Sequence, residues 1–413
     1  MSKVKLLIVN ESLAQGGSEK WIYEICKAID KEKFEVGILT DKNYLFTDKA
    51  RNFQNYHYHE LKKIGVEMYE YLDLDVKRTP LGLGIHRAKR LARHLLGKTK
   101  TKISPKVIDL LQTYDVVCIM DYYNYITLKE VIHKYCEERF FIVLHSNKAQ
   151  FDFDPYAIFD KDKQYNFTYV SPIQIEEIKS TKLNTQKDSF FYNPLVSDLS
   201  KYEYIFNPIT VEPIVISIFS RIAKTRMNDQ FIQAFAQIQQ KLQHKSVLHI
   251  YGEIIDKDYY DHLQQLISSL NIESGSVKFM GHTKDMAASI KNDKVNVYWG
   301  HITNSSCGYS TIEIGAMGVP SFFWTWDEIG ESENNDPDNN LMFLHNKLDD
   351  FEDSNLKYLS DNKLLAELSG KQREFFISRH HITGKIKDFE NYVASLANNS
   401  EKIRCKIASS SYL

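Results

Sequence analysis

A polar loop that leads into a helix, from Asn304 to Pro320, carries residue types suited to binding an anion. It reads NSSCGYSTIEIGAMGVP and follows VNVYWG, an apolar run typical of a buried strand. The N–H groups and the positive dipole end of such a helix suit a diphosphate. Glu313 lies within this helix, and Gly318 and Pro320 end it. An ordinary βαβ unit without a ligand has the same pattern, so both interpretations stay open.

Two arginines form a second candidate site. Arg221 ends the apolar run IVISIFSR, and Arg226 follows it in the loop AKTRMND, which leads into another helix. Both side chains can therefore point to the edge of a sheet formed by the carboxyl ends of its strands, where open α/β sheets bind ligands. Two guanidiniums there could hold phosphate oxygens in bidentate fashion. Without the other motifs, solvated loop charges explain the pair better than a ligand does.

Glycines and a histidine mark two strand ends in the first half of the chain. Gly16 and Gly17 follow the run VKLLIVN and open a helix, so a ligand could approach their backbone closely. A tight turn without a ligand is the alternative. His145 lies near the end of the run FFIVLHSN and, taken alone, is typical of a structural histidine at a strand end.

Apolar runs that alternate with helical patterns must position these residues. The runs lie at 4–10, 34–40, 116–120, 140–147 and 167–172, and then at 214–221, 247–253, 277–282 and 295–300. Strands and helices alternating in this way predict an α/β fold of two doubly wound parallel sheets. The stretch FNPITVEP, at 206–213, predicts a linker between the two halves.

The segment from Lys77 to Lys106 contains ten lysines or arginines and no acidic residue. Its apolar residues between Ile85 and Leu96 recur at helical spacing. A basic amphipathic helix of this kind suits an anionic membrane surface. A solvated basic face on a normally packed helix is the alternative, and nucleic acid is not favoured because no aromatic residues interleave the charges.

Length and composition describe an ordinary globular protein. The chain has 413 residues, a length that suits two or three domains of roughly 150 residues each. Its net charge is −2. Its five cysteines lie far apart without a CxxC pair, which disfavours disulfides or zinc and fits a reducing cytoplasm. The apolar run at the N-terminus is too short for a signal peptide. No run in the chain approaches the ~20 apolar residues of a membrane span.

The order and spacing of these motifs resemble the GT-B glycosyltransferases, most closely the retaining nucleotide-sugar transferases of family 4. The segments FSRIAKTRMND, IYGE, VKFMG and SSCGYSTIEIGAMGVPSFF are similar to the donor-domain motifs of that family, and IVNESLAQGGSEKW is similar to its glycine-rich first loop. The resemblance covers about residues 5 to 395. It implies two Rossmann-like domains facing across a cleft: an acceptor domain at 1–205, a donor domain at 206–384, and at 385–413 a helix that crosses back to the first domain, with a polar, mobile tail.

The resemblance also implies roles for single residues. Arg221 and Arg226 would bind the donor diphosphate, with Arg226 in place of the usual lysine. Glu313 would accept hydrogen bonds from the ribose hydroxyls, and His145 would contact the transferred sugar. The other implied donor-binding positions are Gly16, Gly17, Gly252, Ser305, Ser306, Gly308, Tyr309 and Ser310.

One departure concerns Ser305, which stands where the family has the first of two glutamates. That glutamate usually contacts the sugar hydroxyls, so its loss bears on the identity of the sugar and on activity. Asn304 and Ser306 could supply polar contacts instead. A non-catalytic GT-B-like subunit that binds an acceptor or stabilises a catalytic paralogue is therefore the alternative function.

The expected function is transfer of a sugar from a nucleoside-diphosphate sugar, with a UDP-sugar favoured, to a glycan, lipid-linked or protein acceptor with retention of anomeric configuration. The two arginines and the helix N–H groups would stabilise the leaving diphosphate without a metal. No cofactor is expected besides the nucleotide-sugar substrate. The expected location is the cytoplasm, with the inner face of the membrane or a partner glycosyltransferase subunit as further contacts.

Overall fold

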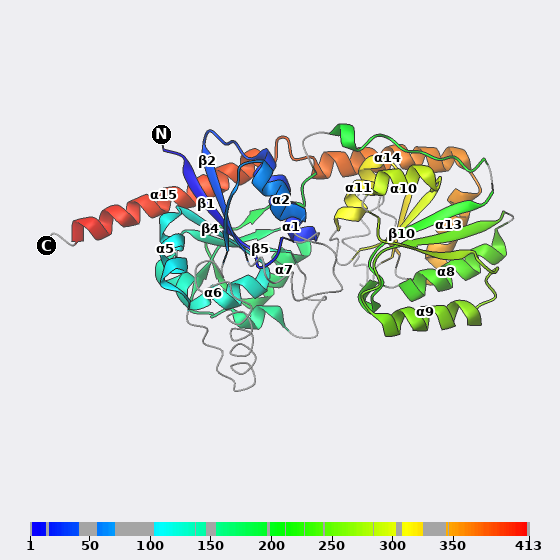
Figure 1. Cartoon of the computed structure of the whole chain (residues 1–413), viewed down its shortest axis with the longest axis horizontal. Helices are drawn as coiled ribbons and strands as arrows, with labels where there is room; N and C mark the ends of the chain where they lie inside the picture. The colour runs from blue at the N-terminus through cyan, green and yellow to red at the C-terminus, as the bar shows by residue number, and fades with distance from the viewer. Residues whose placement is uncertain are drawn as a thin grey trace. The chain divides into compact units, whose positions relative to one another are not determined.

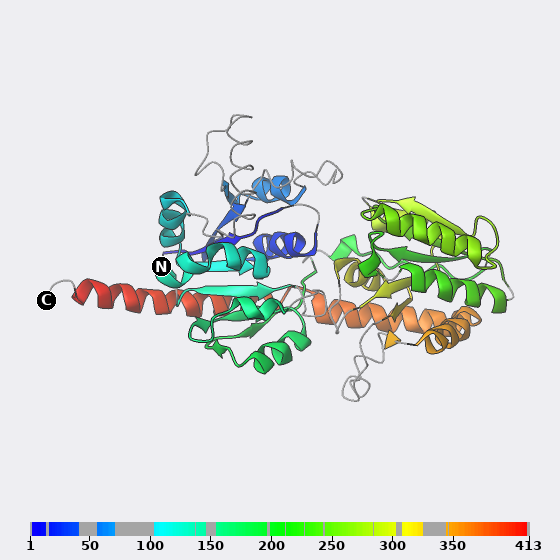
Figure 2. The ribbon, with the colours of Figure 1, turned by 90° about the horizontal axis from the view of Figure 1, so that it is seen from below.

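Two compact units make up the chain in the computed structural model. One unit comprises Met1–Pro194 with Ile382–Leu413, and the other comprises Leu195–His381. The structure describes residues 2–13, 16–40, 56–70, 103–136, 138–145, 154–195, 199–210, 212–226, 228–242, 244–283, 285–302, 308–324, 344–345 and 347–410. Figures 1 and 2 show a sheet flanked by helices in each unit. This confirms the predicted α/β fold with two Rossmann-like domains; the boundary predicted after residue 205 lies C-terminal to Pro194.

The first unit is built on a seven-stranded parallel sheet. Its strands are β1 (Val4–Val9), β2 (Phe34–Thr40), β3 (Glu67–Glu70), β4 (Val116–Met120), β5 (Phe140–Leu144), β7 (Phe167–Tyr169) and β9 (Ser189–Phe190), in the order β3-β2-β1-β4-β5-β7-β9. Every residue of β4 and β5 is buried, as expected for parallel strands covered on both faces. The strand order reverses between β1 and β4, and such a switch point is where doubly wound sheets bind ligands.

Helices cover this sheet, and a separate two-stranded sheet belongs to the same unit. They are α1 (Gly17–Ala28), α2 (Tyr56–Lys63), α5 (Pro105–Thr113), α6 (Asp121–Tyr135), α7 (Pro172–Thr181) and α15 (Ile386–Ser410), with the short helix η3 (Pro155–Ile158) and the strand pair β6 (Gln164–Tyr165) and β8 (Asn184–Thr185). Trp21 of α1 packs edge-on against Phe389 of α15, with ring centroids 5.7 Å apart. The final helix is therefore part of the core of the first unit.

The C-terminal tail and the basic segment at 77–106 were both described by predictions from the sequence. The tail was expected to be polar and mobile. The structure extends α15 to Ser410, since no glycine or proline interrupts the chain after Ile386, and the expected mobility stays a prediction. The basic segment at 77–106 lies outside the described residues up to residue 102, and its last residues begin α5, where Ser104 caps the helix and Pro105 opens it. In the part of the chain that the structure describes, no helix combines the length and apolar composition needed to cross a membrane.

The second unit is built on a six-stranded parallel sheet. Its strands are β10 (Ile214–Phe219), β11 (Ser246–Tyr251), β12 (Val277–Gly281), β13 (Val297–His301), β14 (Ser321–Trp324) and β15 (Leu344–His345), in the order β12-β11-β10-β13-β14-β15. Its helices are α8 (Asn228–Lys241), α9 (Lys257–Ser269), α10 (Met286–Asn292), α11 (Tyr309–Met317), α13 (Leu348–Leu359) and α14 (Asn362–His380), with short helices η4 (Leu199–Lys201) and η5 (Lys224–Arg226). The switch point lies between β10 and β13.

The sheet of the second unit separates two hydrophobic cores. Alternate residues of β10 point to opposite faces, so that Ile216 and Ile218 enter one core while Val215 and Phe219 enter the other. The first core also contains side chains from α8 and α13, and the second contains side chains from α11 and α14. Because β10 is fixed on both faces, the loop that leaves its carboxyl end starts from a rigid position.

Candidate functional site

Arg221 lies directly after β10, at the switch point of the second sheet. Backbone hydrogen bonds continue beyond the strand: Ile222 N donates to Glu253 O at 2.9 Å, and Ile255 N donates to Ile222 O at 3.1 Å. Asn228, fully buried at the start of α8, donates to the carbonyl oxygen of Arg221 at 3.4 Å. These contacts hold the backbone of Arg221 at the carboxyl edge, while its side chain is exposed.

Gly252 allows the ends of β10 and β11 to approach each other. A Cβ atom at Gly252 would lie 1.9 Å from Ser220 O and 3.1 Å from the Cα of Arg221. The first distance is far shorter than a non-bonded contact, so any other residue would displace the backbone that carries Arg221. The structure thus gives Gly252 a positioning role beside Arg221, and direct binding of the donor by Gly252 stays a prediction.

Arg226 ends the short helix η5, where its N–H donates to Ala223 O at 2.9 Å. Burial lowers the pKa of its guanidinium, and the positive charge of Arg221 lowers it further; Tyr298 acts in the opposite direction. Within the described residues, no carboxylate pairs with Arg226. The structure therefore brings the two predicted arginines together and leaves the charge of Arg226 without a described counter-ion, an arrangement that favours a bound anion.

His301 is a further residue of this edge, which the sequence analysis did not find. It is the last residue of β13, on the other side of the switch point from Arg221. Burial, and secondly the charge of Arg226, lower the pKa of His301 to about 4, so its imidazole is neutral near pH 7. The apolar run in the sequence was expected to end one residue earlier, and only the strand order places His301 beside the arginines.

The amino-terminal end of α11 is formed by residues that were predicted to bind an anion, and this binding stays a prediction. Gly308 is its N-cap residue and makes no side-chain capping bond. The N–H of Ile312 donates to Gly308 O at 3.1 Å, and the first N–H groups of a helix have no acceptor within the helix. Gly308, Tyr309 and Ser310 therefore begin the helix as expected, whereas Ser305 and Ser306 lie outside the described residues.

Glu313 lies one turn further along α11 and is positioned by residues distant in sequence. Tyr202 donates its hydroxyl to Glu313 Oε1 at 3.3 Å. Arg373 of α14 donates to the carbonyl oxygens of Tyr202, at 2.7 Å, and of Ala316. Tyr202 and Arg373 thus orient the glutamate. Sequence reasoning missed both because no local pattern links Tyr202 to a residue 111 positions away.

In the first unit, polar side chains join the strands at its switch point. Asn124 donates to Asn10 Oδ1 at 3.2 Å and accepts a bond from Glu11 N at 2.9 Å. Gly16 is the N-cap residue of α1, and a Cβ atom there would lie 2.2 Å from Glu19 Oε2. The carboxylate of Glu19 therefore lies over the helix end, and an anion binding at Gly16 and Gly17 would have to displace it. The predicted phosphate contact of these glycines stays a prediction.

His145 directly follows β5 and packs edge-on against Trp21, with ring centroids 6.0 Å apart and planes at 86°. Its Nε2 atom is buried and has no hydrogen-bond partner among the described residues. Burial lowers the pKa of His145 to about 3. These contacts describe a packed histidine at a strand end, and its predicted contact with the sugar stays a prediction.

The buried state of His145 predicts a dependence of stability on pH. Its pKa is lower in the folded chain than the ordinary value of about 6.5, so the unfolded chain binds more protons and acid favours unfolding. Between pH 7 and pH 5, the free energy of unfolding should fall in wild type and in His145→Gln. We expect the fall to be about 2 kcal/mol smaller in the variant. Denaturant titrations at both pH values measure this difference, with His262→Gln, an exposed position on α9, as the control; equal losses in wild type and His145→Gln would contradict it.

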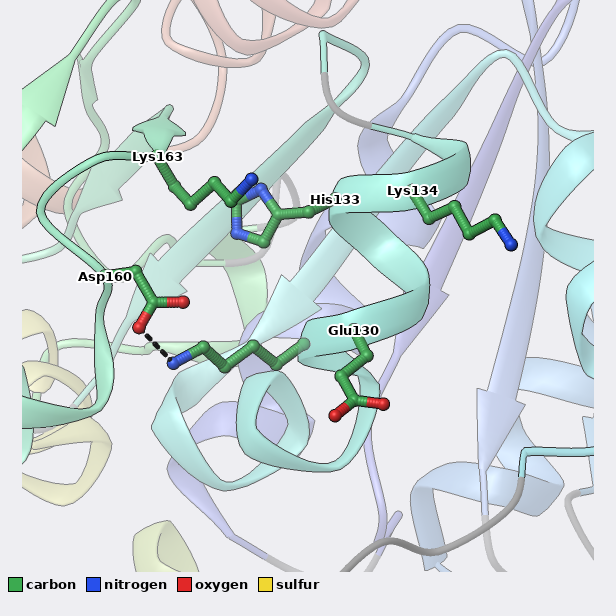
Figure 3. Close-up of a pocket in the computed structure, with 6 residues that line it drawn as sticks. Glu130, His133, Lys134, Asp160 and Lys163 are labelled. Carbon is green, nitrogen blue, oxygen red and sulfur yellow. Dashed lines mark hydrogen bonds and ion pairs between the residues drawn. The ribbon is translucent and has the colours of Figure 1, made fainter.

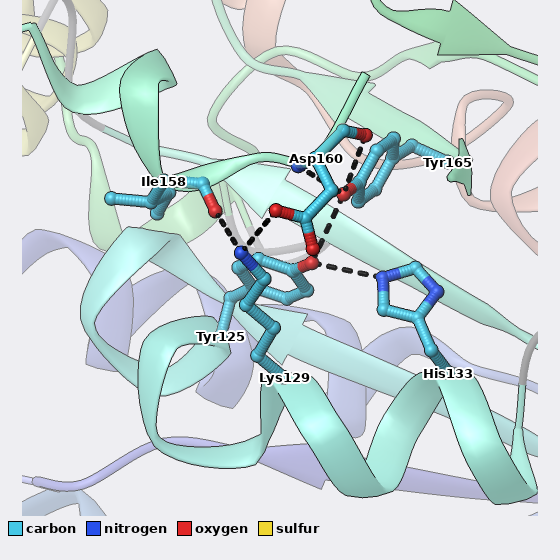
Figure 4. Close-up of polar contacts among 6 residues, drawn as sticks. All are labelled: Tyr125, Lys129, His133, Ile158, Asp160 and Tyr165. Carbon is cyan, nitrogen blue, oxygen red and sulfur yellow. Dashed lines mark hydrogen bonds and ion pairs between the residues drawn. The ribbon is translucent and has the colours of Figure 1, made fainter. Parts of the chain in front are cut away.

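A shallow pocket of about 330 Å³ lies in the first unit, away from these residues. It is lined by Lys129, Glu130, His133, Lys134, Asp160 and Lys163 (Figure 3). Lys129 Nζ contacts Ile158 O at 2.7 Å and Asp160 Oδ1 at 2.8 Å, and His133 Nε2 lies 2.9 Å from the hydroxyl of Tyr125 (Figure 4). Its residues come from the last turns of α6 and from the loop before β6, so it lies at the edge opposite the carboxyl ends. The acidic residues of this pocket offset the charge of its lysines. The pocket contains no residue that was predicted for the functional site.

A comparison with known protein families finds a match in the second half of the chain. The family model of the glycosyl transferases group 1 matches residues 205–375, which contain both arginines and α11. No curated protein matches the sequence. The described residues contain no group of three or more His, Cys, Asp or Glu residues that could hold a metal ion.

Solved structures show the same fold at low sequence identity. HepE from Anabaena, in complex with UDP and glucose, has a TM-score of 0.67 and 15% identity over 95% of this chain and 100% of that chain. A glycosyltransferase from Rickettsia africae has a TM-score of 0.63 and 14% identity over 97% and 100%. Sucrose-phosphate synthase from Thermosynechococcus elongatus has a TM-score of 0.61 and 11% identity over 99% and 100%. The fold is that of the GT-B glycosyltransferases, and together with the family model it supports sugar transfer.

Proposed function

We propose that the protein transfers a sugar from a nucleoside-diphosphate sugar to a glycan, lipid-linked or protein acceptor. The observation that carries the proposal is the position of Arg226. It is a partly buried cation beside Arg221, at the switch point of the second sheet, and no carboxylate of the described residues balances it. A diphosphate, with its two negative charges, is the group that two guanidiniums and a helix end bind best.

The proposed mechanism is electrostatic. Breaking the bond between the anomeric carbon and the diphosphate leaves negative charge on the phosphate oxygens. Arg221, Arg226 and the first N–H groups of α11 are held in place before the reaction, so they stabilise this charge without rearranging. In a transfer with retention of configuration, the departing phosphate accepts the proton of the acceptor on the same face of the sugar. Glu313, oriented by Tyr202, binds the ribose of the donor.

The finer parts of the proposal come from the resemblance and the comparisons. Retention of configuration and membership of family 4 follow from the motif order. UDP is the favoured nucleotide because HepE binds it. Metal independence follows from the two arginines, which supply the positive charge that a metal ion would otherwise provide. The cytoplasm is the proposed location, and no cofactor other than the nucleotide sugar is proposed.

A non-catalytic subunit is the second candidate, and Ser305 is the observation that favours it. Without the first glutamate, the chain could retain donor binding and lose transfer, or bind only an acceptor. Retention of Arg221, Arg226 and Glu313 favours the enzyme, because a subunit that does not bind the donor has no need of an unbalanced, partly buried cation.

A thermal-shift screen against nucleoside diphosphates and their sugars tests the proposal. We expect the nucleoside diphosphate of one base to raise the melting temperature of the protein. The nucleoside-diphosphate sugar of the same base should be consumed when acceptor fractions are added, and EDTA, which removes metal ions, should not prevent this. A ligand at 100 times its Kd stabilises the folded state by about 2.7 kcal/mol, which is several degrees in melting temperature. Binding without turnover would favour the non-catalytic subunit, and no response across the whole panel would contradict donor binding altogether.

A further inference from the structure

His301 and the two arginines converge on one point of the second sheet. Strands β10 and β13 pair in parallel, with Ser217 opposite Tyr298. His301 is the last residue of β13, and Arg221 is the second residue after the end of β10, so both follow the carboxyl direction of the same strand pair. The switch point therefore lies between the end that carries Arg221 and the end that carries His301.

Electrostatic contacts join these residues into one cluster. The charge of Arg226 acts on His301, and the charge of Arg221 acts on Arg226. On the strand of His301 itself, Tyr298 also acts on Arg226. On the other side, His301 is paired with Trp324 of β14, a buried residue without charge. His301 therefore lies near the cation of Arg226 on one side and beside the uncharged Trp324 on the other.

We propose that His301 is a third binding residue of the donor site, whose imidazole donates a hydrogen bond to the diphosphate. This rests on the proposed function. Two arginines already match the two negative charges of a diphosphate, so a third cation would leave the site with excess positive charge. A neutral N–H group adds a directional bond to a phosphate oxygen without that excess. The neutral form is the one that burial beside Arg226 maintains.

Variants at His301 separate this role from a structural one. His301→Phe keeps a ring of similar size but has no N–H group, whereas His301→Asn keeps a donor. We expect His301→Phe to raise the Kd for UDP, measured by calorimetric titration, about tenfold to a hundredfold, as for a lost hydrogen bond to a charged group. His301→Asn should retain most of the affinity. His301→Leu replaces the Phe variant if the latter does not fold, which thermal unfolding without ligand shows.

The control variant is His249→Asn, within β11 of the same sheet, where we expect less than about a twofold change in Kd. Equal Kd values for wild type and for folded His301→Phe or His301→Leu would overturn the inference while leaving the proposed function intact. Equal weakening by the Asn and Phe variants would indicate a structural role and would also overturn it. If UDP and the other nucleoside diphosphates do not bind the wild type, the proposed function itself fails, and this inference fails with it.

Discussion

We expect Arg226→Ala to lower kcat/KM for sugar transfer about 100-fold or more, which is the usual effect of removing one preorganised group that stabilises a developing negative charge. Arg226 is partly buried and lies beside Arg221 at the carboxyl edge of the second sheet. A cation in such an environment interacts with phosphate more strongly than one in water. Arg221→Ala should cause a loss of similar order, on the order of 10²-fold.

The Arg226→Ala variant should not lose stability in the absence of ligand. Burial and Arg221 both oppose the charge of Arg226, so its removal relieves repulsion in the free protein. We therefore expect Arg226→Ala to unfold at the same temperature as wild type or at a higher one, while activity falls. Such a trade between stability and activity is typical of binding sites.

Two further variants control this experiment. Lys224→Ala removes an exposed cation from the same short helix and should change kcat/KM less than about threefold. Arg226→Lys retains the charge but loses the bidentate geometry, so an intermediate loss is expected. Normal turnover in Arg226→Ala, or an equal loss in Lys224→Ala, would contradict the assigned role of Arg226.

The second large effect is expected at Gly252. In Gly252→Val, the new Cβ atom would meet the backbone oxygen of Ser220 at 1.9 Å, so the ends of β10 and β11 must separate. Overpacking of this kind costs typically 1–3 kcal/mol of stability. Because Arg221 follows Ser220 directly, we also expect the Kd for the donor to rise at least about tenfold, the cost of misplacing a group that binds phosphate.

Gly370→Ala is the matched control for this variant. Gly370 lies within α14, and a Cβ atom there has no neighbour within 4 Å. Alanine in a helix interior is favoured over glycine by roughly 1 kcal/mol, so this variant should be as stable as wild type or more stable, with unchanged donor binding. Thermal unfolding and donor titration of both variants measure these effects. Unchanged stability and affinity in Gly252→Val would show that the strand ends are not held as described.

Much of the fold could be predicted from the sequence because parallel strands buried on both faces are continuous apolar runs. The runs that contain β4, β5 and β10 were found for this reason, and so was the beginning of α11 after its glycine. Arg221 could be placed at a strand end because a strand is followed directly by its loop. The end of the final helix could not be predicted because a polar sequence can still be helical.

The rest depended on contacts between distant residues. Neighbouring strands are not consecutive in sequence, so no pattern could place His301 beside Arg226 before the order of β10 and β13 was known. The support of Glu313 by Tyr202 and Arg373 joins three separate segments. These residues are found from packing alone.

The central claim is that the carboxyl edge of the second sheet binds the diphosphate of a nucleotide sugar. Calorimetric titration of UDP, or of the nucleoside diphosphate that the screen selects, into wild type and into the Arg221→Ala, Arg226→Ala double variant tests it most directly. We predict that wild type binds and that the double variant, folded by thermal unfolding, binds at least about 100-fold more weakly. Equal affinities in the two proteins would contradict the claim.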